Sequence, residues 1–519
     1  MKRATVKRME VKMNKHYLLA FILLINTIGI NAQEITFDSE KENLGSTINS
    51  SYPEVKPIIT PDGKTLYFCR QNHPMNIKGE KDDQDIYFSK FVNGRWASAT
   101  NIGSPLNDKY ANGINSVSGD GHSVLIFNGN TFDENIPGAE LSKRTKDGWS
   151  LPIRLEIEDF VNYSEFEDYQ LTSNNKFLIM AVEREDGFGD QDLYVSFHKY
   201  DNSWESPINL GSTINTDKAE FSPFLAADGK TLYFASEGHN GIGSSDIFYS
   251  KRLDETWQKW SEPKNLGPSI NSAELDAYFT IDAAGEYAYF VSMESGQRDI
   301  YRIKLHHEFK PDPVLMIYGY VYDSKSKQPI ECEVKFEDLK TGEELGVAHS
   351  NPETGKYNII LQAGRNYGYR AEAIGHMAVE ENIDLSTIHK YQEIEQDLFL
   401  SPIEVGQIIK LNNVFFDRGK FNLLPSSYPT LDRLVVMLKE NPSIEIELGG
   451  HTDNSGSSVL NVELSLNRVE EVKKYLTSKG ILPERLQTKG YGSSRPIASN
   501  KSEETKKLNR RVEFTILKN

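Results

Sequence analysis

The stretch Thr60-Pro61-Asp62-Gly63-Lys64-Thr65-Leu66-Tyr67-Phe68 decides the fold of the first half of the chain, because near-copies of it return at regular intervals. A close copy runs from Ala227 to Phe234, and weaker copies occupy residues 119–127, 173–180 and 282–290. Asp-Gly between short β-rich runs favours a tight hairpin turn. Each copy therefore predicts a β-hairpin. The turn positions are 58, 54, 54 and 56 residues apart, at Gly63, Gly121, Asn175, Gly229 and Gly285.

Each of the five repeats holds further short strands. A second strand begins with aspartate in four repeats, at Asp85, Asp192, Asp246 and Asp299. A strand with tryptophan follows in four repeats, at Trp96, Trp149, Trp204 and Trp260. The unit ends with the phrase Leu-Gly-Ser-x-Ile-Asn at 210–215, with variants at 102–107 and 266–271. Four short strands per repeat predict one propeller blade each, and hence an all-β five-bladed propeller over residues 34–305.

The fifth repeat lacks its end, since it stops near Leu305 before any tryptophan strand or Leu-Gly phrase. The missing phrase lies at the other end of the chain, as Leu44-Gly45-Ser46-Thr47-Ile48-Asn49. We therefore expect the N-terminal strand to complete the last blade, which removes an exposed sheet edge. The repeats resemble the WD40-like Pro-Asp repeat propellers.

The pattern changes after Pro311-Asp312-Pro313. From Met316 to about Leu400 the sequence alternates in short strands separated by turns such as Pro352-Glu353-Thr354-Gly355. This alternation predicts a small all-β sandwich over residues 314–400. The segment resembles the carboxypeptidase regulatory-like module.

Beyond Pro402 the periodicity is mixed. Ile444, Ile446 and Leu448 alternate with glutamates, as in a strand, whereas apolar residues between 431 and 438 and between 464 and 476 follow helical spacing. Residues 511–517 read as a closing strand. An α/β sandwich domain is therefore predicted over residues 403–519.

Charge is unevenly distributed between these regions. The chain of 519 residues carries a formal charge of −17. Residues 401–519 hold 18 basic against 14 acidic residues, about +4, which leaves about −21 on the remainder. The acidic balance argues against a nucleic-acid binder. The two cysteines, Cys69 and Cys332, fall in different predicted domains, so we expect buried thiols and no disulfide or cysteine metal site.

A targeting segment opens the chain. Lys15 and His16 precede an apolar run from Tyr17 to Ile30, which is short for a membrane span and suits a signal-peptide core. We expect residues 1–32 to be a signal peptide, with either Met1 or Met13 as the start. No cysteine follows the run as a lipid-attachment site. The mature protein is expected in the periplasm, associated with peptidoglycan and the outer membrane.

The motifs that carry function lie in the last domain. They are Gly450-His451-Thr452-Asp453, the helix sequence from Asn461 to Arg468, and Asn509-Arg510-Arg511-Val512. They resemble the OmpA-like, peptidoglycan-associated domain, a family that binds the diaminopimelate stem peptide. The resemblance implies that Asp453 takes the ligand ammonium and that Arg468 takes the carboxylate through two parallel hydrogen bonds. Further positions that it places around the pocket are Thr452, Asn461, Leu464, Arg511, Phe416 and Asp417.

Structural alternatives stand beside these roles. Asp453 is suited to cap a helix, and Arg468 to form a surface ion pair. We expect His451 to make a structural hydrogen bond. Residues 185–192 have the carboxylate density of a calcium loop, but Asp192 repeats in other blades as a strand-start residue. The chain shows no catalytic triad and no phosphate-binding glycine loop, so no catalytic residue, cofactor or metal is predicted.

Together these features predict a non-enzymatic envelope protein. Its C-terminal domain holds peptidoglycan, and its propeller presents a surface to outer-membrane or periplasmic proteins. The order of the three regions also resembles a component of a Bacteroidetes secretion machinery. The alternative is a hydrolase or carbohydrate-binding site in the propeller, which a cluster of inward carboxylates would favour.

Overall fold

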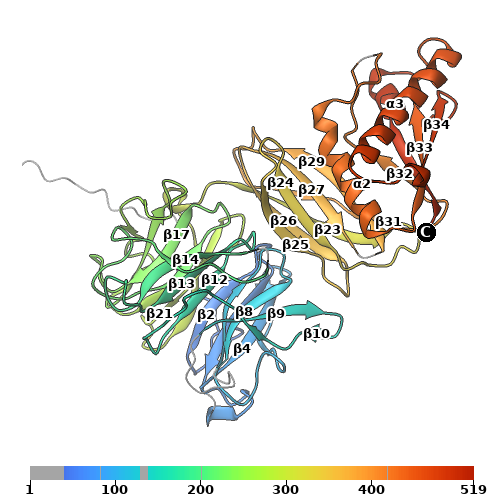
Figure 1. The fold of residues 1–519 in the computed structure, drawn as a ribbon. Helices are drawn as coiled ribbons and strands as arrows, with labels where there is room; N and C mark the ends of the chain where they lie inside the picture. Colours follow the sequence, from blue (N-terminus) through green and yellow to red (C-terminus); the bar gives the residue numbers. More distant parts are fainter. Residues whose placement is uncertain (1–39, 82, 129–137, 200, 374, 418) are drawn as a thin grey trace, which may run out of the picture.

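A computed structural model describes residues 40–519 except residues 82, 129–137, 200, 374 and 418. The expected signal peptide lies outside the described residues. The chain is mostly β, with few helices, and ends in an α/β domain (Figure 1). Over the described ranges, no helix has the length and apolar character needed to cross a membrane.

Residues 42–304 form five antiparallel sheets within the described part of the chain, which we call the five-sheet region. The first sheet contains β2 (Glu54–Ile59), β3 (Thr65–Gln71), β4 (Gln84–Val92), β5 (Arg95–Trp96) and β6 (Thr100–Asn101). The second contains β7 (Asn112–Val117), β8 (Ser123–Asn128), β9 (Glu140–Thr145), β10 (Gly148–Trp149) and β11 (Ile153–Arg154). The third contains β12 (Asp168–Leu171), β13 (Phe177–Val182), β14 (Asp192–Phe197) and β15 (Ile208–Asn209). The fourth contains β16 (Glu220–Leu225), β17 (Thr231–Ser236), β18 (Asp246–Lys251) and β19 (Lys264–Asn265). The fifth contains β20 (Asp276–Ile281), β21 (Tyr287–Ser292), β22 (Asp299–Lys304) and β1 (Glu42–Asn43).

The first strands of the five sheets contact one another in a closed cycle, in the order β2, β7, β12, β16 and β20. The repeated Asp-Gly phrase forms the turn between the first and second strand, as predicted. Gly63 and Gly229 adopt φ of 66° and 67° there, a backbone conformation that glycine tolerates best. Apolar clusters fill the spaces between neighbouring sheets.

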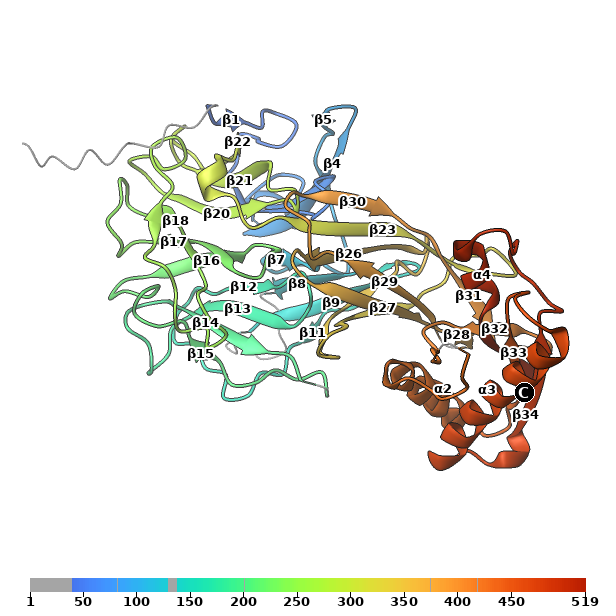
Figure 2. The same ribbon diagram turned by 90° about the horizontal axis from the view of Figure 1, so that it is seen from above.

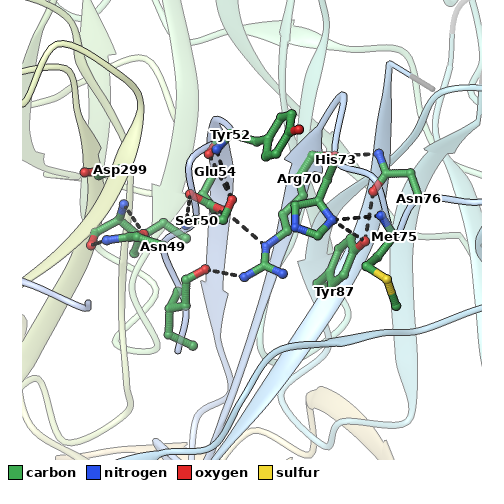
Figure 3. Close-up of polar contacts among 12 residues, drawn as sticks. Asn49, Ser50, Tyr52, Glu54, Arg70, His73, Met75, Asn76, Tyr87 and Asp299 are labelled. Carbon is green, nitrogen blue, oxygen red and sulfur yellow. Dashed lines mark hydrogen bonds and ion pairs between the residues drawn. The ribbon is translucent and has the colours of Figure 1, made fainter. Parts of the chain in front are cut away.

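The N-terminal segment completes the fifth sheet, which confirms the expected pairing. β1 pairs with β22, with Asn43 opposite Tyr301. The amide of Asn49 then clasps the backbone of Ile300: its Nδ2 donates to the carbonyl at 2.9 Å, and its Oδ1 accepts from the N–H at 2.9 Å. Asn43 Nδ2 donates to Asp299 Oδ2 at 2.9 Å (Figure 3 shows Asn49 beside Asp299).

The same clasp recurs in three other sheets. Each asparagine that ends the Leu-Gly phrase exchanges two hydrogen bonds of 2.8–3.0 Å with one backbone residue of the third strand, and these pairs are Asn107 with Ile86, Asn215 with Leu193, and Asn271 with Ile247. The Leu-Gly phrase therefore attaches the last segment of each repeat to the third strand of the sheet through the asparagine side chain, and we call this attachment the fastening. The N-terminal copy makes the same fastening across the chain ends.

The tryptophan segments are less regular than expected. Trp96 and Trp149 lie in two-residue strands, but Trp204 and Trp260 make only isolated bridges. In the second, third and fourth sheets a proline follows three residues after the tryptophan, at Pro152, Pro207 and Pro263. Proline lacks the N–H that a continuous ladder needs, so the fourth segment is interrupted in these three sheets and pairing resumes after the proline, in β11, β15 and β19.

Residues 314–402 form two further sheets, the two-sheet region. One contains β23 (Val314–Asp323), β26 (Lys356–Gln362), β28 (His376–Met377), β30 (Gln392–Glu395) and β31 (Leu398–Pro402). The other contains β24 (Glu333–Asp338), β25 (Glu344–His349), β27 (Asn366–Glu372) and β29 (Val379–Asp384). Both contribute to one apolar core that includes Cys332. Cys69 and Cys332 are buried free thiols, as expected.

The two-sheet region docks on the hairpin turns of the five-sheet region (Figure 2). The turn residues themselves make the contacts, and these are Asp62 to Lys356 Nζ at 3.2 Å, Asp120 to the N–H of His349 at 2.7 Å, Asn174 to the carbonyl of Leu345 at 3.2 Å, Asn175 to the carbonyl of Val347 at 3.0 Å, and Asp228 to the N–H of Asp312 at 2.8 Å. The turns of the first three sheets are thus held directly by the two-sheet region, and the turn of the fourth is held by Asp312 in the segment that leads into it.

The centre of the ring of first strands holds a cavity of about 70 Å³, and Ile360 of the two-sheet region is one of its lining residues. Asp168 also lines it. The Lys56 ammonium lies 2.5 Å from one oxygen of Asp168, and the N–H of Ser222 donates to the other at 2.9 Å. This carboxylate therefore holds three of the first strands together.

The C-terminal domain is a four-stranded sheet with helices against it. Its elements are β32 (Ile408–Leu411), α2 (Tyr428–Glu440), β33 (Glu445–His451), α3 (Ser458–Ser478), β34 (Leu486–Gly492), α4 (Glu503–Asn509) and β35 (Val512–Lys518). The strand order is β32-β35-β33-β34. Apolar residues of α2 and α3 share one core with the sheet, which confirms the predicted helices and strands. Short 3₁₀ turns occupy Gly79–Lys81, His307–Phe309, Pro425–Ser427 and Pro483–Arg485.

Candidate functional site

The candidate site lies where β33 ends and α3 begins. Two neighbouring strands fix the path of the chain, since His451 N–H donates to the carbonyl of Arg511 at 3.0 Å and Thr452 N–H donates to that of Gly492 at 2.9 Å. Asp453 follows directly, with its side chain largely buried. The N-cap position of α3 is Ser457, whose side chain makes no capping hydrogen bond, and Asp453 lies four residues before it, so Asp453 does not have the alternative role of helix cap.

Asn461, in the first turn of α3, holds the loop that carries Asp453. Its Nδ2 donates to the carbonyls of Asp453 at 3.3 Å and Ser455 at 3.0 Å. The N–H of Ser455 in turn donates to Asp453 Oδ1 at 2.8 Å. The expected site residue Asn461 therefore shapes the loop, and its amide nitrogen is occupied by backbone groups.

Asp453 is paired with Arg510, which is not among the site residues predicted from the sequence. Arg510 Nη1 lies 2.8 Å from Asp453 Oδ2, and its Nη2 lies 2.6 Å from Glu503 of α4. Burial raises the pKa of Asp453, but the hydrogen bonds from Arg510 and Ser455 outweigh burial and bring it below its usual value. The carboxylate is therefore anionic at neutral pH.

Arg468 projects from α3 beside this pair. Its Nε donates to the carbonyl of Lys420 at 3.1 Å, and its guanidinium lies 5.0 Å from the ring centre of Phe416. Burial lowers the pKa of Arg468, the nearby Arg510 lowers it further, and Asp453 opposes both. Across the described residues no carboxylate lies within 4.0 Å of this guanidinium, so the alternative of a surface ion pair is not what the structure has.

Arg511 points elsewhere. It is 8% exposed, its Nε lies 2.8 Å from Glu513, and its Nη1 donates to the carbonyl of Arg495 at 3.2 Å. Glu513 also lies 2.9 Å from His451 Nε2, in keeping with a structural role for that histidine. Adjacent residues of an extended chain face opposite ways, so only one arginine of the Asn-Arg-Arg motif meets Asp453. The structure brings Arg510 to it.

The remaining expected residues surround these groups. Phe416 supports Arg468, while Asp417 lies 3.2 Å from Lys420 Nζ. Leu464 is half-buried on α3, and Thr452 is buried beside Asp453. The expected set is thus gathered at one end of the sheet, apart from the side chain of Arg511.

Two glycines allow α3 to approach the sheet closely. A Cβ at Gly450 would lie 2.2 Å from the carbonyl oxygen of Ser465, and one at Gly490 would lie 2.5 Å from that of Val462. Both distances are far below contact, so only glycine permits this packing. The spacing places Arg468 opposite the end of β33.

Residues 415–510 match the model of the OmpA family. The C-terminal domain is OmpA-like. It is 36% identical over 113 residues to outer membrane porin F of Pseudomonas fluorescens, which covers 22% of this chain and 35% of that protein. It is 37% identical over 103 residues to the peptidoglycan-binding protein ArfA of Mycobacterium tuberculosis, which covers 20% of this chain and 32% of that protein. The chain thus spans about a third of these relatives.

Among solved structures, the cell wall anchor of the T6SS from Pseudomonas aeruginosa is 27% identical. The match covers 22% of this chain and 80% of that chain, with a TM-score of 0.20.

The acidic stretch 185–192 ends at Asp192, which is the first residue of β14, as the recurrence of this aspartate in other repeats predicts. Asp192 Oδ2 accepts from the N–H of Phe188 at 2.7 Å and from Asn209 Nδ2 at 2.8 Å. Asp85, Asp246 and Asp299 accept from asparagines at matching positions. Among the described residues, no group of three or more histidine, cysteine or acidic side chains is arranged to hold a metal ion.

Proposed function

We propose that the C-terminal domain binds peptidoglycan by capturing the zwitterionic end of its diaminopimelate residue. Diaminopimelate carries an ammonium and a carboxylate on one carbon, so a receptor needs an anion and a cation side by side. The observation that carries the proposal is the placement of Asp453 and Arg468 at the end of β33. One is a buried carboxylate, and the other is a guanidinium that has no carboxylate within 4.0 Å among the described residues.

The roles follow from chemistry. Asp453 accepts from the ligand ammonium, and Arg468 donates two parallel hydrogen bonds to the ligand carboxylate. Arg510 shares Asp453 with the ammonium and adds a second positive charge toward the carboxylate, while Glu503 keeps it in place. Charge-assisted hydrogen bonds of about 1.5–3 kcal/mol each add up to micromolar affinity. The name of the relative ArfA states the same ligand class.

The five-sheet region is proposed to be a five-bladed β-propeller that presents a surface to an envelope protein. The closed cycle of first strands and the pairing of β1 with β22 support this architecture. The two-sheet region is proposed to be a carboxypeptidase regulatory-like module. We place the whole protein in the periplasm as a non-enzymatic tether.

Sedimentation of the full chain with purified sacculi tests the wall site. Asp453→Ala and Arg468→Ala are each expected to weaken binding by roughly 2–4 kcal/mol, about 30- to 1000-fold, because one ligand charge is left unmatched. Arg468→Lys also weakens binding, since the two-pronged contact is lost. Lys474→Ala serves as the matched control, because this exposed cation lies further along the same helix.

Competition identifies the ligand. Free diaminopimelate should displace the wild-type protein from sacculi, and lysine should do so less well because it lacks the second carboxylate. If both alanine variants co-sediment as wild type does, the assigned pocket is wrong.

A further inference from the structure

Two neighbouring loops of the five-sheet region form an exposed surface that is both acidic and apolar. They join β11 to β12 (155–167) and β13 to β14 (183–191), and we call them the acidic loop pair. The first loop has five acidic residues and the second has four, against the single basic residue Arg184. Arg184 is itself bonded to Asp186 at 3.0 Å. The net charge of these 22 residues is −8.

Large apolar side chains stand among these carboxylates. Phe166 is 71% exposed, Tyr163 57%, Phe188 52% and Val161 39%. Exposed apolar patches that are rimmed by polar residues mark interaction sites on soluble proteins. Aromatic side chains also dominate the energetics of protein interfaces.

The loop pair is fixed in shape by hydrogen bonds between its two halves. Tyr163 N–H donates to the carbonyl of Glu183 at 2.9 Å, and Glu183 N–H donates back to Asn162 Oδ1 at 2.9 Å. Arg184 Nη1 donates to the carbonyl of Asp159 at 2.8 Å. A surface ordered in advance loses less conformational entropy when it binds.

The position of the loop pair suits a second contact of the protein. β12 and β13 end on one side in the turn with Asn174 and Asn175, which docks on the two-sheet region. The loop pair lies at the opposite ends of the same strands, about 20 Å away for a six-residue strand. A partner bound there is kept away from the turn that contacts the two-sheet region.

We propose that the acidic loop pair binds a cationic polypeptide segment that carries apolar side chains. Lysine or arginine matches the carboxylates, and apolar side chains cover Phe166, Phe188 and Tyr163. Cations also bind directly over aromatic faces. A charge of −8 disfavours an anionic membrane surface or an anionic polymer. The inference deepens the partner role proposed for the five-sheet region, and it is independent of the wall site.

The test uses the full chain and a labelled 16-residue peptide of lysine, phenylalanine and leucine, followed by fluorescence anisotropy. Two further peptides have every lysine replaced by glutamate, or every apolar residue replaced by serine. Two double variants, Phe166→Ser with Phe188→Ser and Glu185→Gln with Asp190→Asn, are each expected to bind the first peptide at least tenfold more weakly. Both altered peptides should bind wild type at least tenfold more weakly.

Matched controls change exposed residues elsewhere on the five-sheet region. Leu151→Ser with Leu253→Ser, at 76% and 65% exposure, and Glu205→Gln with Glu262→Gln should bind within twofold of wild type. The proposal is overturned if the loop variants bind as wild type does, or if the serine peptide binds as tightly as the first. Sacculus sedimentation of the same loop variants should be unchanged, so failure of the wall site and failure of the loop pair are read separately.

Discussion

Replacing Asn49 by alanine tests the fastening between the two ends of the five-sheet region. Its amide makes three hydrogen bonds, two to the backbone of Ile300 and one to Asn43 Oδ1 at 2.8 Å. The Ile300 carbonyl keeps a second partner, the N–H of Leu44 at 3.1 Å. The Ile300 N–H keeps none among the described residues, and Ile300 is 0% exposed.

The magnitude follows from these contacts. A buried donor left without a partner costs about 1–3 kcal/mol, and each other lost neutral hydrogen bond costs about 0.5–1.5 kcal/mol. Asn49→Ala should therefore lower the unfolding free energy of the five-sheet region by roughly 2–6 kcal/mol. Truncation of residues up to Ser50 should cost more, because Ile48, at 0% exposure, and the β1 pairing are also lost.

Urea unfolding of the full chain, followed by tryptophan fluorescence, measures the change, since the tryptophans lie in the five-sheet region. Ser46→Ala is the control, because Ser46 is exposed in the same loop. Asn215→Ala removes the equivalent fastening within the third sheet and should cost a similar amount. An unfolding midpoint for Asn49→Ala equal to that of Ser46→Ala would refute the assigned role of this fastening.

Three further outcomes are expected. Burial tends to lower the pKa of His349, but its hydrogen bonds to Asp120 and Glu333 raise this pKa from 6.5 to about 9. Wild type should therefore be more stable than His349→Gln, with the full difference present below pH 6.5 and lost as the pH rises through 9. A difference in melting temperature that does not depend on pH would contradict this. Arg511→Met should destabilise the C-terminal domain by about 3 kcal/mol, because the buried carboxylate of Glu513 loses its ion pair with Arg511. The folded variant should still co-sediment with sacculi. Loss of co-sedimentation without loss of stability would assign Arg511 to the ligand. Gly450→Ala should lower both stability and sacculus binding, since the new Cβ would collide with Ser465, and a thermal melt and sedimentation equal to wild type would show that α3 can shift freely.

Repetition made much of the five-sheet region readable from sequence. Asp-Gly turns at fixed spacing predicted the hairpins, and the stray Leu-Gly phrase at the N-terminus predicted the pairing with the last strand. The strands around the tryptophans were predicted less accurately. Prolines three residues after Trp149, Trp204 and Trp260 interrupt the fourth segments, and tryptophan alone suggested longer strands than form.

The candidate site shows a different limit. The positions of the motifs predicted that Asp453 and Arg468 belong to one site. Which of Arg510 and Arg511 pairs with Asp453 depends on the face of the strand to which each side chain points. The alternating strand that follows the Asn-Arg-Arg motif indicates that the two arginines point to opposite faces. Docking of the turns could not be predicted, because Asp62 and Asp120 satisfy a turn locally and their second partners lie 294 and 229 residues away.

The docked turns also determine how mechanical load passes through the molecule. When the C-terminal domain is held and the five-sheet region is pulled, the force enters through contacts on three separate turns in addition to the covalent segment at Pro311, where Asp312 also bonds the fourth turn. Contacts loaded side by side share the force, so no single one bears all of it. The two regions therefore resist separation as one stiff body, and a sliding or twisting load meets the same three attachment points at once.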